Sequence, residues 1–331
     1  MKNELSIVII GRNEQASIGM CIEAARAAAE EIGGADLLYV DSHSTDNTVA
    51  EGQRYGIAVK MLDRDLRPSP SAARHFGSRQ TNNEYILFLD ADTLIYTGFL
   101  KTALEQLRSD AQLGGINGRI YDTTAAGEPV DGVDEVCEEA QNVKWLRGPC
   151  CLYRRAALVE VGSFDPELAT EEEAELGLRL IGAGWRLRTA PVPMAHHTRC
   201  YHPTSFRALV TTFLRDLRSG RLGEITRTCL HARRAGNGLE FCWLRLKTTI
   251  LFLGWLFAIG AAVLFLPLDL RPEIVTPSLV IIGFIAVTAK KRSFSEALLF
   301  VPAKVLNLVD LILGIRKIGP FVESRLLKSQ R

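Results

Sequence analysis

Short apolar runs alternate with longer segments of helical pattern along the N-terminal part of the chain. The apolar runs predict strands over residues 5–10, 36–40, 58–62 and 85–89. The segments between them predict helices over residues 17–31, 45–55 and 71–80. Strands separated by helical patterns of about 10–15 residues indicate βαβ units and a parallel sheet. Because such crossovers are right-handed, the sheet is expected to be doubly wound.

The pattern is less regular after residue 92. Helices are predicted over residues 99–108, 156–161 and 171–183, and strands over residues 115–121 and 149–153. The sequence therefore predicts an α/β domain spanning residues 1–204, built on a doubly wound mixed sheet with helices on both faces.

The C-terminal third contains two uncharged apolar runs. Residues 248–268 are long enough to span a bilayer as a helix, and residues 274–289 form a shorter run that contains Pro277. Basic residues flank the pair on both sides, which predicts a membrane hairpin with both ends in the cytoplasm. The length of the first run favours this interpretation over a buried helical hairpin of a soluble protein.

Two other segments extend the predicted membrane part. Residues 297–315 indicate an interfacial helix or a third membrane helix. Residues 205–222 place apolar positions at helical spacing with arginines between them, which suits a helix on an anionic membrane surface or one packed on the N-terminal domain. The chain is therefore divided into the N-terminal domain, a basic juxtamembrane linker over residues 205–247 and a membrane domain over residues 248–331. A multi-pass protein of the inner (cytoplasmic) membrane is expected.

Composition excludes some classes of function. The formal net charge is +1, so no global electrostatic attraction favours a nucleic-acid partner. The seven cysteines show no metal-binding spacing, which is typical of reduced thiols in a cytoplasmic domain. No signal peptide is expected, because the apolar run at residues 5–10 is short and runs straight into a turn.

Polar residues follow three of the predicted strands. Asn13 and Glu14 follow the first, Asp41 ends the second, and Asp90 and Asp92 end the fourth. The carboxyl ends of such strands form the ligand-binding edge of open α/β sheets. Paired carboxylates there can hold a divalent cation that keeps open positions for phosphates. No G-x-G-x-x-G follows the first strand, so this is not a dinucleotide site.

The segment after the second strand also has a purely structural interpretation. Ser44 or Asp46 would serve as the N-cap of the helix that follows. Capping and ligand contact use different side chains, so the two interpretations are compatible.

Several segments, taken in order, resemble family 2 glycosyltransferases of the GT-A fold. The resemblance covers roughly residues 5 to 200 and rests on residues 13–14, 40–48, 72–77, 88–92, 148–166 and 172–180. It implies a nucleotide-diphosphate-sugar donor (a UDP-, GDP- or dTDP-sugar), Mn²⁺ or Mg²⁺, and an inverting transfer. By this resemblance Asn13 and Glu14 line the nucleoside pocket and Asp41 contacts the nucleobase. Asp90 lies near the ribose and the metal, and Asp92 ligates the metal.

The resemblance also assigns residues outside the strand ends. Arg74 would lie beside the diphosphate or brace the acidic loop. His197 would complete the metal site, which suits Mn²⁺ better than Mg²⁺ because imidazole is a borderline ligand. Gly148 would allow close backbone approach to a substrate. Trp145 would stack on a sugar ring, unless it is a core aromatic. Arg199, Tyr201 and His202 are weaker candidates for the diphosphate.

A second acidic centre lies at residues 171–173. By the resemblance Glu173 is the general base, with Glu172 as the alternative. A sugar hydroxyl attacks well only as its proton leaves, and a positioned carboxylate supplies about 10²- to 10⁴-fold in rate. The structural alternative is an acidic first helical turn stabilised by the helix dipole.

The predicted function is transfer of a sugar to a hydroxyl of a lipid-linked oligosaccharide or other carbohydrate acceptor in cell-surface polysaccharide synthesis. The nearest alternative is a polyprenyl-phosphate glycosyltransferase, whose ionised acceptor needs no base. A processive synthase is disfavoured by the few apolar runs and by the missing Gln-x-x-Arg-Trp pattern. A non-catalytic membrane scaffold and a nucleotidyltransferase are the remaining alternatives, and the second lacks its Gly-rich basic loop.

Overall fold

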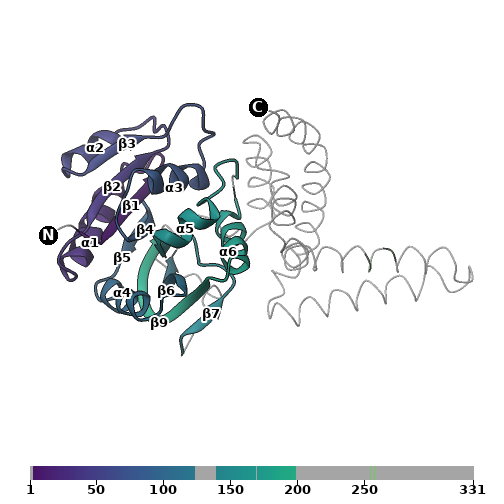
Figure 1. Cartoon of the computed structure of the whole chain (residues 1–331). Helices are drawn as coiled ribbons and strands as arrows, with labels where there is room; N and C mark the ends of the chain where they lie inside the picture. Colours follow the sequence, from purple (N-terminus) through teal and green to yellow (C-terminus); the bar gives the residue numbers. More distant parts are fainter. Residues whose placement is uncertain (1–2, 124–138, 169, 199–253, 255–256, 258–331) are drawn as a thin grey trace, which may run out of the picture. The chain divides into compact units, whose positions relative to one another are not determined.

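The computed structural model describes residues 3–123, 139–168 and 170–198, together with residues 254 and 257. Within them, one sheet lies between two helical layers (Figure 1). The strands are β1 (Leu5–Gly11), β2 (Asp36–Asp41), β3 (Ala58–Met61), β4 (Tyr85–Asp90), β5 (Thr93–Ile95), β6 (Leu113–Thr123), β7 (Gln141–Val143), β8 (Cys150–Arg154) and β9 (Arg186–Thr198). The helices are α1 (Ile18–Glu30), α2 (Thr48–Arg54), α3 (Pro70–Arg79), α4 (Phe99–Ser109), α5 (Arg155–Val161) and α6 (Glu172–Gly182).

The strand order is β3-β2-β1-β4-β8-β6-β9-β5, and β7 pairs with β9. Strands β3, β2, β1 and β4 are parallel, and β8 runs antiparallel to both β4 and β6. The chain moves outward from β1 to β3 and then returns to place β4 on the other side of β1. Ligands of open α/β sheets bind at such a reversal, outside the carboxyl ends of the strands. The predicted mixed α/β sheet is confirmed.

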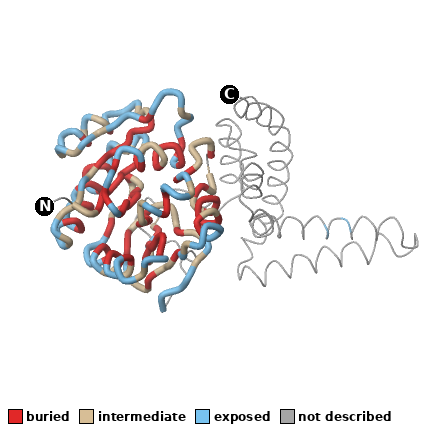
Figure 2. Tube along the Cα trace, viewed as in Figure 1, coloured by how far each residue is buried: buried red, intermediate tan, exposed pale blue. Residues whose placement is uncertain are grey.

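The central strands β1, β4 and β8 are buried (Figure 2). Alternate residues of a strand point to opposite faces. In β1, Ile7 and Ile9 belong to the cluster that packs with α1 and α4. Val8 and Ile10 belong to the opposite cluster, with residues of α3, α5 and α6. Helices therefore cover both faces, which accounts for the continuous apolar run of β4 and the nearly continuous one of β1.

The structure contains strands that the sequence pattern did not predict. These are β5, β7 and β9. Strand β9 includes Pro191 and Pro193, which interrupt an ordinary strand pattern, and its register against β6 shifts between Leu113 and Ile120. Helix α2 begins at Thr48 rather than at residue 45, because the preceding residues bond to the loop after β1.

The predicted segments at residues 205–222, 248–268, 274–289 and 297–315 lie outside the described residues, apart from residues 254 and 257, as do Arg199, Tyr201 and His202. Among the helices that the structure describes, none combines the length and the apolar character needed to cross a membrane.

Candidate active site

The loops after β1 and β2 are joined by hydrogen bonds. The Asn13 side-chain oxygen accepts from the Thr45 backbone N–H at 2.7 Å, and the Asn13 N–H donates to Ser44 Oγ at 2.8 Å. The Glu14 N–H donates to Thr48 Oγ1 at 2.8 Å. Asn13 has a φ of 60°, a left-handed conformation that asparagine tolerates better than most residues. The two loops therefore form one surface at the carboxyl edge of the sheet.

Asp41 lies beneath this surface and is fully buried. It accepts hydrogen bonds from the Tyr39 hydroxyl at 2.9 Å, the Ser44 N–H at 2.8 Å and the Ser44 hydroxyl at 2.6 Å. Its observed role is to shape the turn after β2, and its contact with a nucleobase stays a prediction. Burial raises the pKa of Glu14, and the hydrogen bond from Ser17 opposes the shift. The nucleoside roles of Asn13 and Glu14 also stay predictions.

Arg74 of α3 connects the end of β4 to α6. Its guanidinium is buried, and one terminal nitrogen donates to Asp90 at 2.8 Å and to the Gly148 carbonyl at 2.9 Å. The other donates to Glu172 at 2.7 Å and to Glu173 at 2.9 Å. Arg74 therefore braces acidic side chains, and its predicted place beside the diphosphate stays a prediction.

Three carboxylates share this single buried cation. Burial raises the pKa of Asp90 to about 6, against the opposing effect of Arg74. Burial and the neighbouring charge of Glu172 raise the pKa of Glu173. The Glu173 side chain is 16% exposed and that of Glu172 only 6%, so Glu173 is the more accessible of the pair. A raised pKa brings a carboxylate closer to the value that suits a general base near neutral pH.

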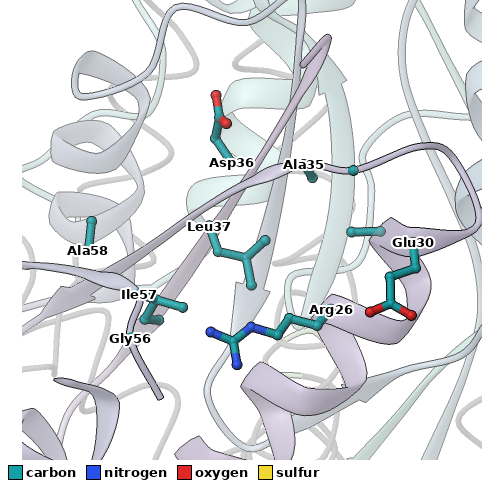
Figure 3. Close-up of a pocket in the computed structure, with 10 residues that line it drawn as sticks. Arg26, Glu30, Ala35, Asp36, Leu37, Gly56, Ile57 and Ala58 are labelled. Carbon is teal, nitrogen blue, oxygen red and sulfur yellow. The ribbon is translucent and has the colours of Figure 1, made fainter. Parts of the chain in front are cut away.

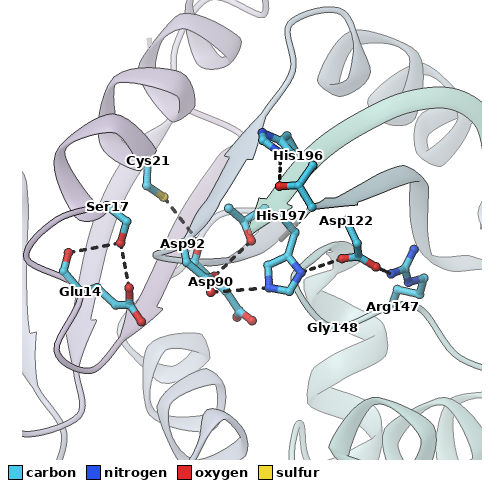
Figure 4. A network of polar contacts seen from close by, with 12 residues as sticks. Glu14, Ser17, Cys21, Asp90, Asp92, Asp122, Arg147, Gly148, His196 and His197 are labelled. Carbon is cyan, nitrogen blue, oxygen red and sulfur yellow. Dashed lines mark hydrogen bonds and ion pairs between the residues drawn. The ribbon is translucent and has the colours of Figure 1, made fainter. Parts of the chain in front are cut away.

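A histidine and a carboxylate face each other on the other side of the site (Figure 4). Nε2 of His197, on β9, lies 3.6 Å from Oδ2 of Asp92, and Nδ1 of His197 lies 2.8 Å from Oδ1 of Asp122 on β6. Burial alone would lower the pKa of His197, but the contacts with Asp122 and Asp92 raise it to about 9. The neighbouring His196 instead contacts Thr123 at 2.7 Å, because adjacent strand residues point to opposite faces.

The described residues contain no group of three or more His, Cys, Asp or Glu side chains arranged to hold a metal ion. The donor set still fits a divalent cation. Asp92 offers a partly exposed carboxylate, and His197 turns one nitrogen toward it while the other contacts a carboxylate. A histidine whose second nitrogen is held in this way is typical of metal sites. Asp92 and His197 would hold the cation, whereas one Asp90 oxygen is already paired with Arg74.

The family model "Glycosyl transferase family 2" matches residues 6–162. These residues are a family 2 glycosyltransferase domain. The match ends before Glu172, Glu173 and His197, so their placement rests on the geometry described above. The matched part includes the strand ends that carry Asn13, Asp41 and Asp90.

Two curated relatives are similar to the glycosyltransferase domain. A pre-mycofactocin glycosyltransferase of Mycobacterium tuberculosis is 27% identical over 161 residues, which is 45% of this chain and 33% of the relative. The poly-beta-1,6-N-acetyl-D-glucosamine synthase of Staphylococcus aureus is 23% identical over 172 residues, 48% of this chain and 42% of the relative. The similarity therefore spans less than half the length of either relative.

Solved structures share the fold at low sequence identity. The mannosyltransferase PcManGT from Pyrobaculum calidifontis, in complex with GDP-Man and Mn²⁺, has a TM-score of 0.65 at 14% identity, over 94% of this chain and 87% of that one. Residues 1–349 of S. aureus TarS, in complex with UDP-GlcNAc, give 0.52 at 16% identity, over 93% and 89%. The GT-A-like fold of the family 2 domain is confirmed.

Two residues that matter to this site were absent from the sequence prediction. Asp122 holds His197, and the Arg147 guanidinium donates to Asp122 at 2.6 Å. Asp122 directly follows the strand predicted over residues 115–121, so the signal that singled out Asp41 and Asp90 was available for it.

Trp145 is half-buried, and its Cβ lies against Gly177 of α6.

A separate groove of about 420 Å³ lies at the opposite edge of the family 2 domain (Figure 3). It is lined by the end of α1 and by the starts of β2 and β3. Two of its charged groups have partners within the fold: Arg26 donates to the Tyr55 carbonyl, and Asp36 accepts from Asn3 and Asn83, each at 2.7 Å. The groove lies at the amino ends of β2 and β3, whereas the candidate site lies at the carboxyl ends of the parallel strands.

Replacing Gly148 by alanine tests how closely the base is held. A Cβ at Gly148 would lie 2.1 Å from Oε1 of Glu173, the flexible end of that side chain. We expect Gly148→Ala to displace the carboxylate and lower kcat by roughly 100-fold, because misplacing a catalytic group by about 1 Å costs that much. The thermal midpoint should change little, since a side-chain end can turn away. Steady-state kinetics and thermal unfolding check both expectations.

Gly177→Ala is the matched comparison. There a Cβ would lie 2.3 Å from the Lys144 carbonyl, a backbone atom that cannot turn aside. We expect this variant to lose stability. If Gly148→Ala unfolds early and Gly177→Ala does not, the assigned contacts are wrong.

Proposed function

We propose that the protein is a membrane-anchored, inverting glycosyltransferase. It moves a sugar from a nucleotide-diphosphate-sugar to a hydroxyl of a lipid-linked oligosaccharide or similar carbohydrate acceptor, in cell-surface polysaccharide synthesis. The observation that carries the proposal is the contact of Arg74 with both Asp90 and Glu173. Through this contact, Arg74 links the end of β4, where the donor is expected to bind, with a partly buried carboxylate that is able to act as a base.

The donor side is supported by the joined loops and by the structural neighbours. Asn13 and Glu14 lie on the surface formed by the loops after β1 and β2, where a nucleoside would rest. The neighbours include complexes with GDP-Man and with UDP-GlcNAc. Asp92 and His197 would hold Mn²⁺ or Mg²⁺, which stabilises the charge that develops on a leaving diphosphate.

Glu173 supplies the chemistry on the acceptor side. It accepts the proton of the attacking hydroxyl, while Arg74 holds its carboxylate in place. Glu172 is more buried and pairs with the same guanidinium, so it supports Arg74 rather than reaching the acceptor. A phosphate acceptor, as in a polyprenyl-phosphate glycosyltransferase, needs no such base. The accessible Glu173 carboxylate therefore favours a hydroxyl acceptor.

The membrane part of the proposal is supported by the sequence. The apolar runs at residues 248–268 and 274–289, with basic flanks, suit an anchor that keeps the catalytic domain at the cytoplasmic face. An anchored enzyme favours an acceptor that is itself in the membrane. The non-catalytic scaffold is the alternative from another class, and it predicts no nucleotide-sugar binding.

Thermal stabilisation by nucleotide-sugars tests the proposal. A ligand that binds the folded state raises its apparent stability, by about 2.7 kcal/mol at 100 times Kd. We expect one class among UDP-, GDP- and dTDP-sugars to raise the thermal midpoint with Mn²⁺ or Mg²⁺ and not with EDTA. Asp92→Ala should abolish the effect, and Glu105→Ala, which removes an exposed carboxylate of α4, should leave it unchanged. If no nucleotide-sugar stabilises the wild-type protein, the scaffold alternative replaces the transferase.

A further inference from the structure

Asp122 and His197 are register partners on the parallel strands β6 and β9. The Asp122 side chain is fully buried, and its two oxygens have different partners. Oδ1 lies 2.8 Å from Nδ1 of His197, and Oδ2 accepts from the Arg147 guanidinium at 2.6 Å. Figure 4 shows the resulting chain of contacts from Arg147 through Asp122 and His197 to Asp92.

We propose that Asp122 is a positioning residue for the cation site, which it serves by fixing the tautomer and the orientation of His197. The inference rests on the proposed function, because it takes His197 as a ligand of the cation. A neutral imidazole has one N–H donor and one acceptor nitrogen. An ionised carboxylate only accepts, so Asp122 retains the proton on Nδ1. Nε2, which faces Asp92, is then the nitrogen left to give its lone pair to a cation.

Arg147 occupies the second oxygen of Asp122, the one that does not contact His197. It also donates to the Ile120 carbonyl at 3.2 Å, which ties it to the same strand as Asp122. With Oδ2 occupied by Arg147, the carboxylate presents Oδ1 to His197. Arg147 directly precedes Gly148, whose carbonyl accepts from Arg74. The segment beside the base thus also contacts the residue that orients the cation ligand.

His196 provides an internal comparison. Its Nε2 contacts the Thr123 hydroxyl, which can donate or accept, so that contact does not select a tautomer. The two adjacent histidines therefore differ in whether a neighbouring side chain determines which ring nitrogen carries the proton. Only His197 has a partner that obliges one nitrogen to be the donor and leaves the other for a cation.

Asp122→Asn tests the proposal, because a carboxamide has one acceptor oxygen and cannot accept from both Arg147 and His197. When its oxygen faces Arg147, its NH₂ faces Nδ1 and moves the imidazole proton to Nε2. Mn²⁺ binding to the purified full chain is followed by the EPR signal of free Mn²⁺, with Mn²⁺ alone and with saturating UDP or GDP. We expect Mn²⁺ to bind about 10- to 100-fold more weakly, as is typical when such an outer partner is lost.

A second variant tests the tautomer argument itself. Arg147→Met alone leaves the carboxylate on His197, so its Mn²⁺ affinity should stay within about threefold of wild type. Combined with Asp122→Asn, it frees the amide oxygen to accept from Nδ1 and should restore most of the lost affinity. If Arg147→Met weakens Mn²⁺ binding as much as Asp122→Asn does, or the double variant shows no recovery, the proposed selection of a tautomer is wrong.

Asp122→Glu keeps the test valid if Asp122→Asn does not fold, which thermal unfolding in EDTA will show. It retains the charge but shifts the carboxylate by one methylene, so a positioning role predicts weaker Mn²⁺ binding and a purely electrostatic role predicts unchanged binding. If Asp122→Asn and Asp122→Glu fold and both bind Mn²⁺ within twofold of wild type, the inference is overturned and the proposed function still stands. Wild-type protein that binds no Mn²⁺ under any of these conditions overturns both.

Discussion

Replacing Glu173 by glutamine is expected to lower kcat by about 10²- to 10⁴-fold while donor affinity stays near that of the wild type. The amide has nearly the same shape as the carboxylate but cannot accept the proton of an attacking hydroxyl. Arg74 would still contact its oxygen, so the surrounding site should keep its geometry. The measurement is steady-state sugar transfer, with donor affinity determined separately by calorimetry.

Glu172→Gln is the matched control, since it changes the adjacent residue on the same guanidinium. Removing the charge of Glu172 should reduce kcat far less, because this side chain is nearly inaccessible. It should also lower the pKa of Glu173, whose value the Glu172 charge helps to raise. The acid limb of the pH–rate profile should therefore move to lower pH. A large loss in Glu172→Gln with an active Glu173→Gln would assign the base to Glu172.

Replacing Arg74 by methionine is expected to destabilise the domain by about 3–5 kcal/mol, the usual cost of leaving a buried charge without its partner. Arg74 is 1% exposed and pairs with Asp90, Glu172 and Glu173 at 2.7–2.9 Å. Methionine fills much of the volume but leaves three clustered carboxylates without a cation. The thermal midpoint should fall by roughly 10 °C for a domain of this size.

Arg186→Met is the control for this effect. Arg186 also pairs with a carboxylate at 2.8 Å, that of Asp110, but its side chain is 46% exposed. Exposed pairs of this kind contribute about 1 kcal/mol or less. Similar thermal midpoints for Arg74→Met and Arg186→Met would mean that the buried cluster does not hold α3, β4 and α6 together.

The parts of the fold that the sequence predicted are those with a strong local signal. Strands β1 and β4 are buried on both faces, so β4 is an uninterrupted apolar run that ends at Asp90 and β1 is apolar apart from Ser6. Asp90 and Asp92 were identified because two carboxylates that directly follow such a strand lie at the ligand-binding edge of an open α/β sheet. The acidic start of α6 was visible in a similar way, as a cluster of glutamates before a regular helical pattern.

The parts that were not predicted depend on contacts between distant segments. Strand β9 carries two prolines and owes its existence to pairing with β6 and β5. The pairing of Asp122 with His197 joins residues 75 positions apart, and that of Arg74 with Glu173 joins residues 99 apart. Hydrophobic periodicity and short motifs describe neighbouring residues only, so they cannot predict contacts between residues this far apart in the chain. The sequence accordingly allowed two roles for Arg74, contact with the diphosphate or support of the acidic loop. The structure shows its guanidinium among the carboxylates.

The most direct test is transfer of labelled sugar from the nucleotide-sugar that stabilises the protein to a lipid extract of bacterial membranes. Wild-type full-length protein, Asp92→Ala and Glu173→Gln are compared with Mn²⁺ and with EDTA. We expect labelled lipid-linked saccharide only with wild type and metal, and none above background with either variant. Transfer that persists in Glu173→Gln and yields a phosphate-linked sugar would contradict a hydroxyl acceptor and assign the acceptor to a polyprenyl phosphate.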